Sequence, residues 1–482
     1  MKIFPRCLAV CLLALAVPMH ARAQELPQQL VGGVPGALGQ VGYIDLLAGM
    51  GYTSNALLST GASKADEVAT AGFATDYVRQ GMLSIDLLGN LERIEYLNHS
   101  FGGSFYGQFA GSALWGKSTD PLQWQLSDSF GEVMTDPLAA PTPSELQTIN
   151  DVSTGPNLNL HFGLATRLTL SGRYSRTSYQ RSPFDAQTFT GGAELSHSLT
   201  AASFVAVQGS WAKTQYLQQS LLHSYYGRPT PNFNITQAAL VYNAKYVRTN
   251  VQLRAGYNIV NFGGGITHGA PLYQVSLSRQ ISPFSTVFVN ASQAYSTNGT
   301  SLGSTNAQIG LQVGAGVSPE LAVAQPFLQR SGSLGWEFNR ARTTLSLAGT
   351  VDQAIFTQQT GLGTGGNYID EGAVLSLGRQ LRPTLSVQLN ARGSIDRYSQ
   401  LHAHTQREDV ALSVSKRFFR LSVSFYVERM QQSGAPGRSG YLVGSYSDDR
   451  VGLYFTYSLV GAQGTGAAMN GIPGIGSFMG GY

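Results

Sequence analysis

Two short stretches carry the residue types that catalysis or nucleotide binding would need. The segment from Gly299 to Gly303 matches the G-x-S-x-G pattern of a serine nucleophile, and the segment from Gly361 to Gly366 matches G-x-G-x-x-G. A nucleophile elbow requires a strand–turn–helix context, and phosphate binding requires a helix that begins at the glycines. Neither segment is followed by a helical pattern. We therefore expect polar loops here, with no catalytic residue and no cofactor.

A pair of histidines is the best candidate for a metal site. His402 and His404 are close enough to hold one ion together, but no third ligand is evident nearby. The two cysteines, Cys7 and Cys11, lie in the N-terminal segment that we interpret below as cleaved, which excludes thiolate chemistry in the mature chain. A lipid-modifying enzyme would need a Ser/His/acid cluster on neighbouring strands, and we find none. The sequence predicts no metal site and no enzyme.

The N-terminal segment has the features of a signal peptide. Lys2 and Arg6 precede a short apolar run, and Ala21-Arg22-Ala23 is a small-x-small cleavage site. Removing this segment lowers the net charge from +4 to +1, so no basic surface for nucleic acid is expected. Charged residues are 12% of the chain, well below the roughly 25% of soluble domains. The predicted organisation is a signal peptide (1–23), a periplasmic leader (24–40), a barrel (41–459) and a Gly-rich tail (460–482).

Alternating apolar and polar residues dominate the chain from Val41 onward. In the segment from Leu385 to Arg392, the leucines and valine alternate with Ser386, Gln388 and Asn390. Such segments run for about 10 to 14 residues, which is longer than a typical globular strand and is the length that transmembrane strands need. The pattern predicts an all-β, antiparallel, up-and-down transmembrane barrel of about 20 strands, with 18–20 the expected range.

The connections between these segments alternate in length. Short ones such as 164–167 alternate with long ones such as 135–150, which is rich in proline. Bacterial outer-membrane barrels combine short periplasmic turns with longer extracellular loops. A barrel must also close on itself, because every backbone amide in hydrocarbon needs a partner. We therefore expect an outer-membrane location and lipid as the first partner. Insertion would use the barrel-assembly machinery.

The last alternating segment, from Arg450 to Leu459, is predicted to close the barrel. Val451, Leu453, Phe455, Tyr457 and Leu459 fall on one face, which we assign to lipid. The 23 residues that follow are rich in glycine and nearly free of charge. Two interpretations stay open: a periplasmic tail without contacts, or a segment that folds back and narrows the lumen.

Assigning the apolar faces to lipid leaves the other faces to line the lumen. A lumen of this width holds water or a plug, since wall side chains alone cannot fill it. We interpret the charges on its wall as hydration and cross-strand ion pairs in preference to a specific binding ring. The candidate lumen-lining residues are Asp45, Asp76, Asp86, Glu92, Arg173, Glu194, Lys245, Arg254, Glu337, Asp352, Arg392, Asp396, Tyr426 and Glu428.

One stretch of about 35 residues is more specific than the barrel pattern. The segment from Asp128 to Gly163, together with "GMGYTSN" near the start, resembles the exosortase/PEP-CTERM-system-associated outer-membrane barrel family of the putative β-barrel porin type. The matching residues are Asp128, Phe130, Gly131, Pro143, Asn150, Thr154, Gly155 and Pro156, whereas Ser144 and Glu145 depart from the family pattern. The resemblance implies a link to exopolysaccharide export and to periplasmic export components. It supplies no catalytic residue.

These observations lead to one main hypothesis and two alternatives. The main hypothesis is an outer-membrane channel that serves export of a surface exopolysaccharide. The first alternative is a general or substrate-specific porin for small solutes, and the second is a structural surface barrel. The Pro-rich loop near Pro143 is expected on the long-loop side, where it could cap the lumen or fold into it.

Overall fold

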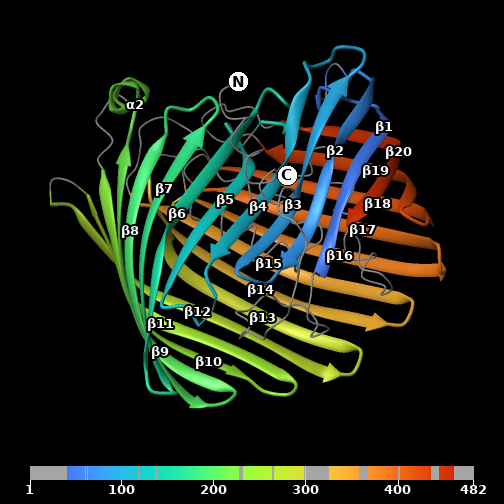
Figure 1. Cartoon of the computed structure of the whole chain (residues 1–482). Helices are drawn as coiled ribbons and strands as arrows, with labels where there is room; N and C mark the ends of the chain where they lie inside the picture. The colour runs from blue at the N-terminus through green and yellow to red at the C-terminus, as the bar shows by residue number, and fades with distance from the viewer. Residues whose placement is uncertain are drawn as a thin grey trace.

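Twenty antiparallel strands form a single closed barrel in the computed structural model of the chain (Figure 1). The structure describes residues 41–59, 61, 63–117, 119–135, 139–226, 232–262, 265–297, 299, 325–357, 367–399, 402–435 and 444–460. The predicted signal peptide and leader, the tail from residue 461, and the segments 300–303 and 361–366 lie outside these residues. The transmembrane barrel expected from the alternating pattern is confirmed.

Each strand pairs with the strands before and after it in sequence, and Figure 1 shows the closure where β20 lies beside β1. The strands are β1 (Val41–Thr53), β2 (Asp66–Arg79), β3 (Leu83–Tyr96), β4 (Ser104–Trp115), β5 (Leu122–Met134), β6 (Leu146–Phe162), β7 (Thr166–Tyr179), β8 (Ala186–Thr200), β9 (Ser203–Tyr216), β10 (Phe233–Lys245), β11 (Thr249–Phe262), β12 (Thr267–Ser282), β13 (Ser285–Ser296), β14 (Phe327–Arg340), β15 (Thr343–Phe356), β16 (Tyr368–Arg382), β17 (Leu385–Tyr398), β18 (Ala403–Phe418), β19 (Leu421–Ala435) and β20 (Tyr446–Val460).

One short helix, α2 (Gln219–Tyr226), lies in the connection between β9 and β10. Within the described residues, no helix is long and apolar enough to cross a membrane.

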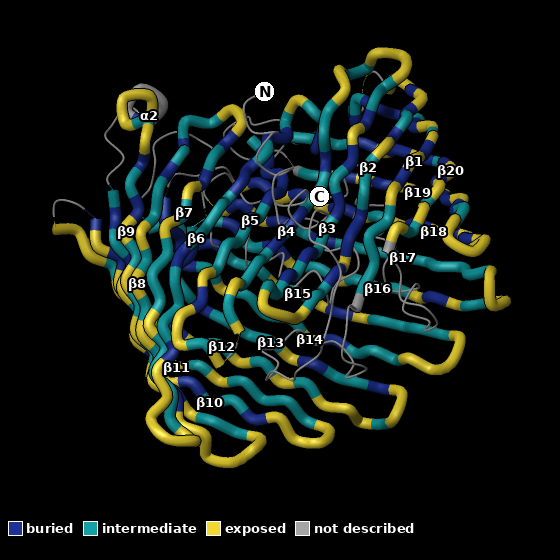
Figure 2. Tube along the Cα trace, in the orientation of Figure 1, coloured by how far each residue is buried: buried dark blue, intermediate teal, exposed yellow. Residues whose placement is uncertain are grey.

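The two ends of the barrel differ in their connections. Short turns such as 163–165, 201–202 and 383–384 join the strands at one end, called here the short-turn end. The long connections, including 54–65 and 135–145, all lie at the opposite, long-loop end. Figure 2 shows the exposed short turns along the lower edge. This arrangement follows the predicted alternation and confirms that the loops segregate by length.

The outer face of the barrel is apolar. Large hydrophobic side chains at alternate positions are exposed, as on β20, where Leu453, Phe455 and Tyr457 are about 40% exposed (38%, 42% and 44%). Leu240 on β10 (65%) and Leu334 on β14 (60%) are exposed in the same way. Apolar surface in such a continuous belt is stable against lipid and unfavourable in water. The closing strand therefore meets lipid, as its alternation predicts.

Backbone pairing closes the sheet between its first and last strands. The register runs from Thr53 opposite Arg450 to Ile44 opposite Val460, with one irregularity at Ile44 and Asp45. Because the sheet closes, the residues of β1 and β20 within this register have a neighbouring strand on both sides.

Two glycines on the inner face make room for aromatic rings of neighbouring strands. A Cβ on Gly49 of β1 would overlap the ring of Tyr454, and a Cβ on Gly452 of β20 would overlap the ring of Tyr426. The rings lie flat across the glycines and restore the packing that a bare backbone lacks. Their centroids are 5.4 Å apart.

Candidate functional site

All fourteen predicted lumen-lining residues lie on the inner face of the barrel. Side chains of a strand alternate between faces, so each position follows from the pairing register and from the exposed apolar neighbours. Asp76 and Lys245 are exposed, and Glu92, Asp396, Tyr426 and Glu428 are buried. The remaining eight are half-buried: Asp45, Asp86, Arg173, Glu194, Arg254, Glu337, Asp352 and Arg392. Their position does not test whether they bind a cargo.

The register brings some of these residues together and separates others. It gathers most of the carboxylates on one continuous part of the inner face, formed by β15–β20 and β1–β3. We call this part the acidic wall. Its carboxylates are Asp352, Asp370, Asp396, Asp409, Glu428, Asp448, Asp45, Asp76, Asp86 and Glu92, and its arginines are Arg392, Arg407 and Arg450.

The opposite part of the inner face, formed by β7–β14, carries both signs and is called the mixed wall. Its predicted residues are Arg173, Glu194, Lys245, Arg254 and Glu337. Arg173 donates hydrogen bonds to the side chains of Gln125 (2.7 Å) and Asn157 (2.5 Å), and its guanidinium also reaches backbone carbonyls. Glu194 accepts a hydrogen bond from Gln208. The charges of this wall are spaced by neutral polar groups.

Two buried arginines hold the long-loop end of the acidic wall together. Arg450 contacts Asp448 (2.6 Å) and Glu428 (3.8 Å), and all three side chains are nearly inaccessible to solvent. Arg407 contacts Asp396 (3.6 Å) and donates a hydrogen bond to Gln432 (2.9 Å). Both guanidinium groups are therefore neutralised within the wall.

Cross-strand carboxylates also meet directly. Asp352 of β15 stands opposite Asp370 of β16, which stands opposite Asp396 of β17. Like charges in directly opposed positions destabilise a sheet unless a cation balances them. Arg407 balances the charge of Asp396, whereas Asp352 is half-buried and faces the lumen.

Five charged residues of this wall were not among the sequence predictions: Asp370, Arg407, Asp409, Asp448 and Arg450. Asp448 and Arg450 continue the alternation of Gly452 and Tyr454 toward the N-terminus, so the pattern itself contained the signal. Asp370 is adjacent to Glu371, and only the register shows that Asp370 faces inward. Glu371 lies outside and pairs with Arg397 at 2.9 Å.

The loop between β1 and β2 is fastened to the acidic wall. Asp448 accepts hydrogen bonds from the Thr53 hydroxyl (2.8 Å) and from the backbone N–H of Asn55 (2.9 Å). These bonds bring Leu58 inward, where it packs with Met430 and Tyr446 in a small apolar cluster. The polar network thus positions a loop over the wall at the long-loop end.

The Pro-rich loop between β5 and β6 joins the same cluster through Ala140. Its base is closed by the Thr135 hydroxyl, which donates to the carbonyl of Glu145 at 3.0 Å. The guanidinium of Arg181 supports it by donating to the carbonyls of Pro143 and Ser144. Its neighbour strand β6 begins at Leu146, so the prediction of a loop as far as Asn150 was wrong. Residues 146–150 pair fully with β5, and that pairing overrides the weak local pattern.

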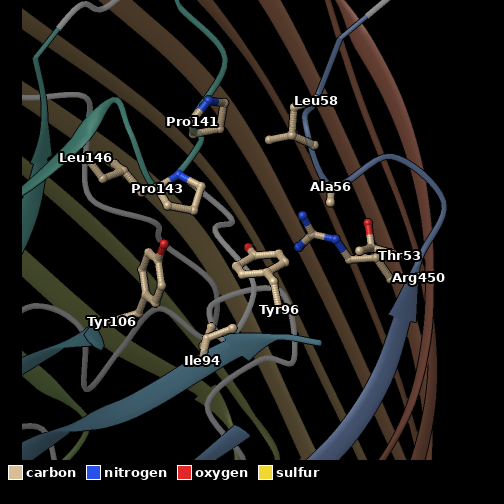
Figure 3. Close-up of a pocket in the computed structure, with 10 residues that line it drawn as sticks. All are labelled: Thr53, Ala56, Leu58, Ile94, Tyr96, Tyr106, Pro141, Pro143, Leu146 and Arg450. Atoms are coloured by element: carbon tan, nitrogen blue, oxygen red, sulfur yellow. The ribbon is translucent and has the colours of Figure 1, made fainter. Parts of the chain in front are cut away.

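A small pocket lies beneath these two loops. Figure 3 shows Pro141 and Pro143 on one side and the guanidinium of Arg450 pointing toward the ring of Tyr96 on the other. The remaining lining residues are Thr53, Ala56, Leu58, Ile94, Tyr106 and Leu146. Both loops therefore lie over Arg450 of the acidic wall. For the Pro-rich loop, this agrees with the expected position on the long-loop side.

Aromatic side chains of β9–β11 and β14–β17 line the inner face at the long-loop end. We call them the aromatic collar. Phe233 stacks with Tyr216 (6.3 Å between centroids) and with Phe262 (6.0 Å), and Leu222 of α2 is fully buried in the same cluster. The collar continues on later strands with Phe327, Phe356, Tyr368 and Tyr398.

The collar corrects the assignment of every apolar face to lipid. At the long-loop end the strands extend toward the loops, and apolar side chains on the inner face pack on one another and on α2. The alternating pattern alone cannot separate this small core from the lipid-facing belt, because both are apolar.

No strong metal site emerges from the described residues. His402 is at a loop position and His404 lies on β18, and no group of three or more His, Cys, Asp or Glu side chains within the described ranges is arranged to hold an ion. The prediction that the chain has no metal site stays a prediction.

Comparison with known proteins gives fold similarity only. No protein-family model matches the chain, and no curated protein does. Among solved structures, it is similar to the siderophore receptor PirA from Acinetobacter baumannii, with 12% identity over 87% of this chain and 81% of that chain, at a TM-score of 0.46.

Two further solved structures are similar at the same level. PirA from Pseudomonas aeruginosa is 13% identical (86% and 80% covered, TM-score 0.40), and the FrpB iron transporter from Neisseria meningitidis is 8% identical (86% and 82% covered, TM-score 0.41). Similarity of this extent says nothing about the cargo of this chain. The chain is a transmembrane β-barrel with a charged inner face, and two of its loops lie over the acidic wall at the long-loop end.

Proposed function

We propose that the chain is an outer-membrane β-barrel channel that serves export of a surface exopolysaccharide. The location is supported by the apolar outer belt and by the segregation of short turns and long loops, which are features of bacterial outer-membrane barrels. The proposal assigns the chain no enzymatic step. Its partners would be outer-membrane lipid, the polysaccharide and periplasmic export components.

The observation that carries the proposal is a series of neutral hydrogen-bonding side chains on the inner face. Asn290 accepts a hydrogen bond from Ser276 (2.7 Å) and donates one to Ser333 (3.1 Å). Further along the wall, Asn390 accepts from Ser376 (2.9 Å) and from Gln388 (3.2 Å). We call these residues the amide–hydroxyl ladder.

The amide–hydroxyl ladder suits a cargo that is rich in hydroxyl groups. Amides and hydroxyls both donate and accept hydrogen bonds, so they can exchange partners with sugar hydroxyls as a chain moves. The residues are half-buried and form two groups across neighbouring strands of the wall, one on β12–β14 and one on β16–β17. No single position holds the cargo tightly, as conduction requires.

Deleting the gene and measuring surface and secreted polysaccharide tests this proposal. We expect export to fall and polysaccharide to accumulate in the periplasm, with recovery when the wild-type gene is returned. Unchanged surface and secreted polysaccharide would overturn the proposal. The matched control is a strain in which the gene carries Glu371→Gln, a substitution on the outer face that should leave export intact.

The alternative of a small-solute porin is favoured by one observation, the half-buried carboxylates that line the lumen on the acidic wall. Planar-bilayer conductance and liposome swelling separate the two functions. A large, steadily open channel with broad uptake favours the porin, whereas a closed channel that opens when residues 139–145 are shortened favours a gated exporter. A barrel without conductance in both forms would favour the structural alternative.

A further inference from the structure

Three carboxylates gather at the short-turn end of the acidic wall. Asp45, Asp76 and Asp86 lie on the inner faces of β1, β2 and β3, and the charges of Asp76 and Asp86 act on one another. The only hydrogen bond to Asp45 from a side chain in the described residues comes from Ser458 (2.6 Å). Within those residues, no lysine or arginine forms an ion pair with any of the three. The acidic wall is therefore negatively charged at the short-turn end, and we call this part of it the vestibule.

A second, independent observation lies farther along the same wall. Glu92 is 1% exposed, and neither of its carboxylate oxygens has a hydrogen-bond partner. Its side chain extends over Gly72 of the neighbouring strand and lies near Tyr426 and Tyr454. A carboxylate buried in this way is unfavourable while it is charged, so it is either protonated or balanced by a positive charge.

These groups form a series along the barrel axis. Glu92 stands six residues beyond Asp86 on β3, which is about 20 Å along the strand toward the long-loop end at the usual rise of a strand. Glu428 follows on β19, and Asp409 and Asp352 face the lumen on β18 and β15. Carboxylates therefore occur from the vestibule to the long-loop end.

The three arginines of the wall offset only part of this charge, because the wall carries ten carboxylates. Arg407 and Arg450 are buried and occupied by Asp396, Asp448 and Glu428. Arg392 is half-buried and is the one arginine of the acidic wall that remains beside the lumen-facing carboxylates. The net potential along the wall is negative, and rings or rows of carboxylates favour cations in a pore.

We propose that the lumen is cation-selective, and that its cargo is uncharged or carries amino groups and is not a polyanion. The second clause rests on the proposed export function. A polysaccharide rich in uronic acids or phosphate would be repelled over the whole length of the wall. A neutral or amine-bearing chain would follow the amide–hydroxyl ladder, with its amino groups balanced by the carboxylates of the vestibule.

The test is the reversal potential of the full-length mature barrel in a planar bilayer under a KCl gradient near 0.1 M, where the Debye length is about 10 Å. The wild-type protein is measured beside a form in which residues 139–145 are replaced by a short Gly-Ser link, which removes the Pro-rich loop from its place above Arg450. We expect a K⁺-to-Cl⁻ permeability ratio of about three or more, since charges within a Debye length act on every passing ion.

The variants assign the selectivity to the wall. Asp45→Asn/Asp76→Asn/Asp86→Asn should lower the ratio by about half, because it removes the vestibule charge without changing side-chain size. The matched control is Glu194→Gln/Glu337→Gln on the mixed wall, which should leave the ratio nearly unchanged. Glu92→Gln, at a side chain that is 1% exposed, should change the ratio less than the triple variant does.

Four results would overturn the inference. These are anion selectivity, no selectivity, a ratio that falls more in the mixed-wall control than in the triple variant, and no conductance in either form of the protein. Export is tested separately by the gene deletion. If the purified barrel is cation-selective and the deletion strain still exports polysaccharide normally, the export function is refuted and the selectivity stands.

Discussion

At the long-loop end, the inner faces of the two walls are held in place by different kinds of contact. On the mixed wall, aromatic rings such as Phe233 and Phe262 pack on one another beneath α2. On the acidic wall, buried arginines and carboxylates hold the loop that follows β1. Aromatic packing does not depend on one exact geometry, whereas a buried charge network is stable only when every charge is paired. We therefore expect substitutions on the acidic wall to be more destabilising than substitutions on the mixed wall.

The largest effect should come from removing the cation at the centre of the network. Arg450→Met leaves Glu428 and Asp448 buried without their partner, which should cost about 3–5 kcal/mol of unfolding free energy. Arg254→Met on the mixed wall is the control, since Arg254 is half-buried and makes one long hydrogen bond to Gln237 (3.4 Å). Urea unfolding in lipid vesicles, followed by tryptophan fluorescence, measures both. Equal midpoints for the two variants would contradict the proposed difference between the walls.

The aromatic collar should show the next effect. Phe233→Ala removes a side chain that is 2% exposed and stacks on two neighbours, so it should destabilise the barrel by about 3 kcal/mol. The loss should not depend on salt, unlike losses at more accessible charges. The same urea titration at low and high salt checks this. A change of less than about 1 kcal/mol would show that the collar is not a packed core.

A smaller loss of stability is expected where a glycine leaves room for an aromatic ring. Gly49→Ala places a methyl group against the ring of Tyr454 and should cost about 1–3 kcal/mol. Gly172→Ala on β7 is the matched control, because a Cβ there meets nothing within 4 Å. The two variants are compared by gel electrophoresis of samples heated to increasing temperatures. The measured quantity is the temperature at which the folded band disappears. Equal temperatures would mean that Tyr454 moves aside without cost.

The smallest effect should come from a charge pair outside the lumen. Arg397→Ala breaks the exposed pair with Glu371 and should change stability by less than about 1 kcal/mol, because exposed pairs are weak. Arg407→Ala, at the buried pair with Asp396, is the comparison and should cost several times more. Urea midpoints of the two variants give the ratio. A larger loss for Arg397→Ala would reverse the expected order.

Much of the barrel could be predicted because its strands are long and regular. The alternation in β17 and β20 predicts which side chains meet lipid, and the exposed Leu453 and Phe455 agree with it. The start of β6 was misplaced, since the residues after Pro143 show little alternation and take their strand conformation from pairing with β5. The lumen-facing charges of separate strands could be proposed one by one, but their partners could not.

The sequence by itself determined the strands, the inward and outward faces and the two kinds of connection, because a period of two residues and local turn chemistry are properties of neighbouring residues. The tertiary structure alone decided that β20 closes on β1, that Asp352, Asp370 and Asp396 stand side by side, and that two loops cover Arg450. Register between strands depends on pairing across the whole sheet, so the division into an acidic and a mixed wall exists only in the closed barrel.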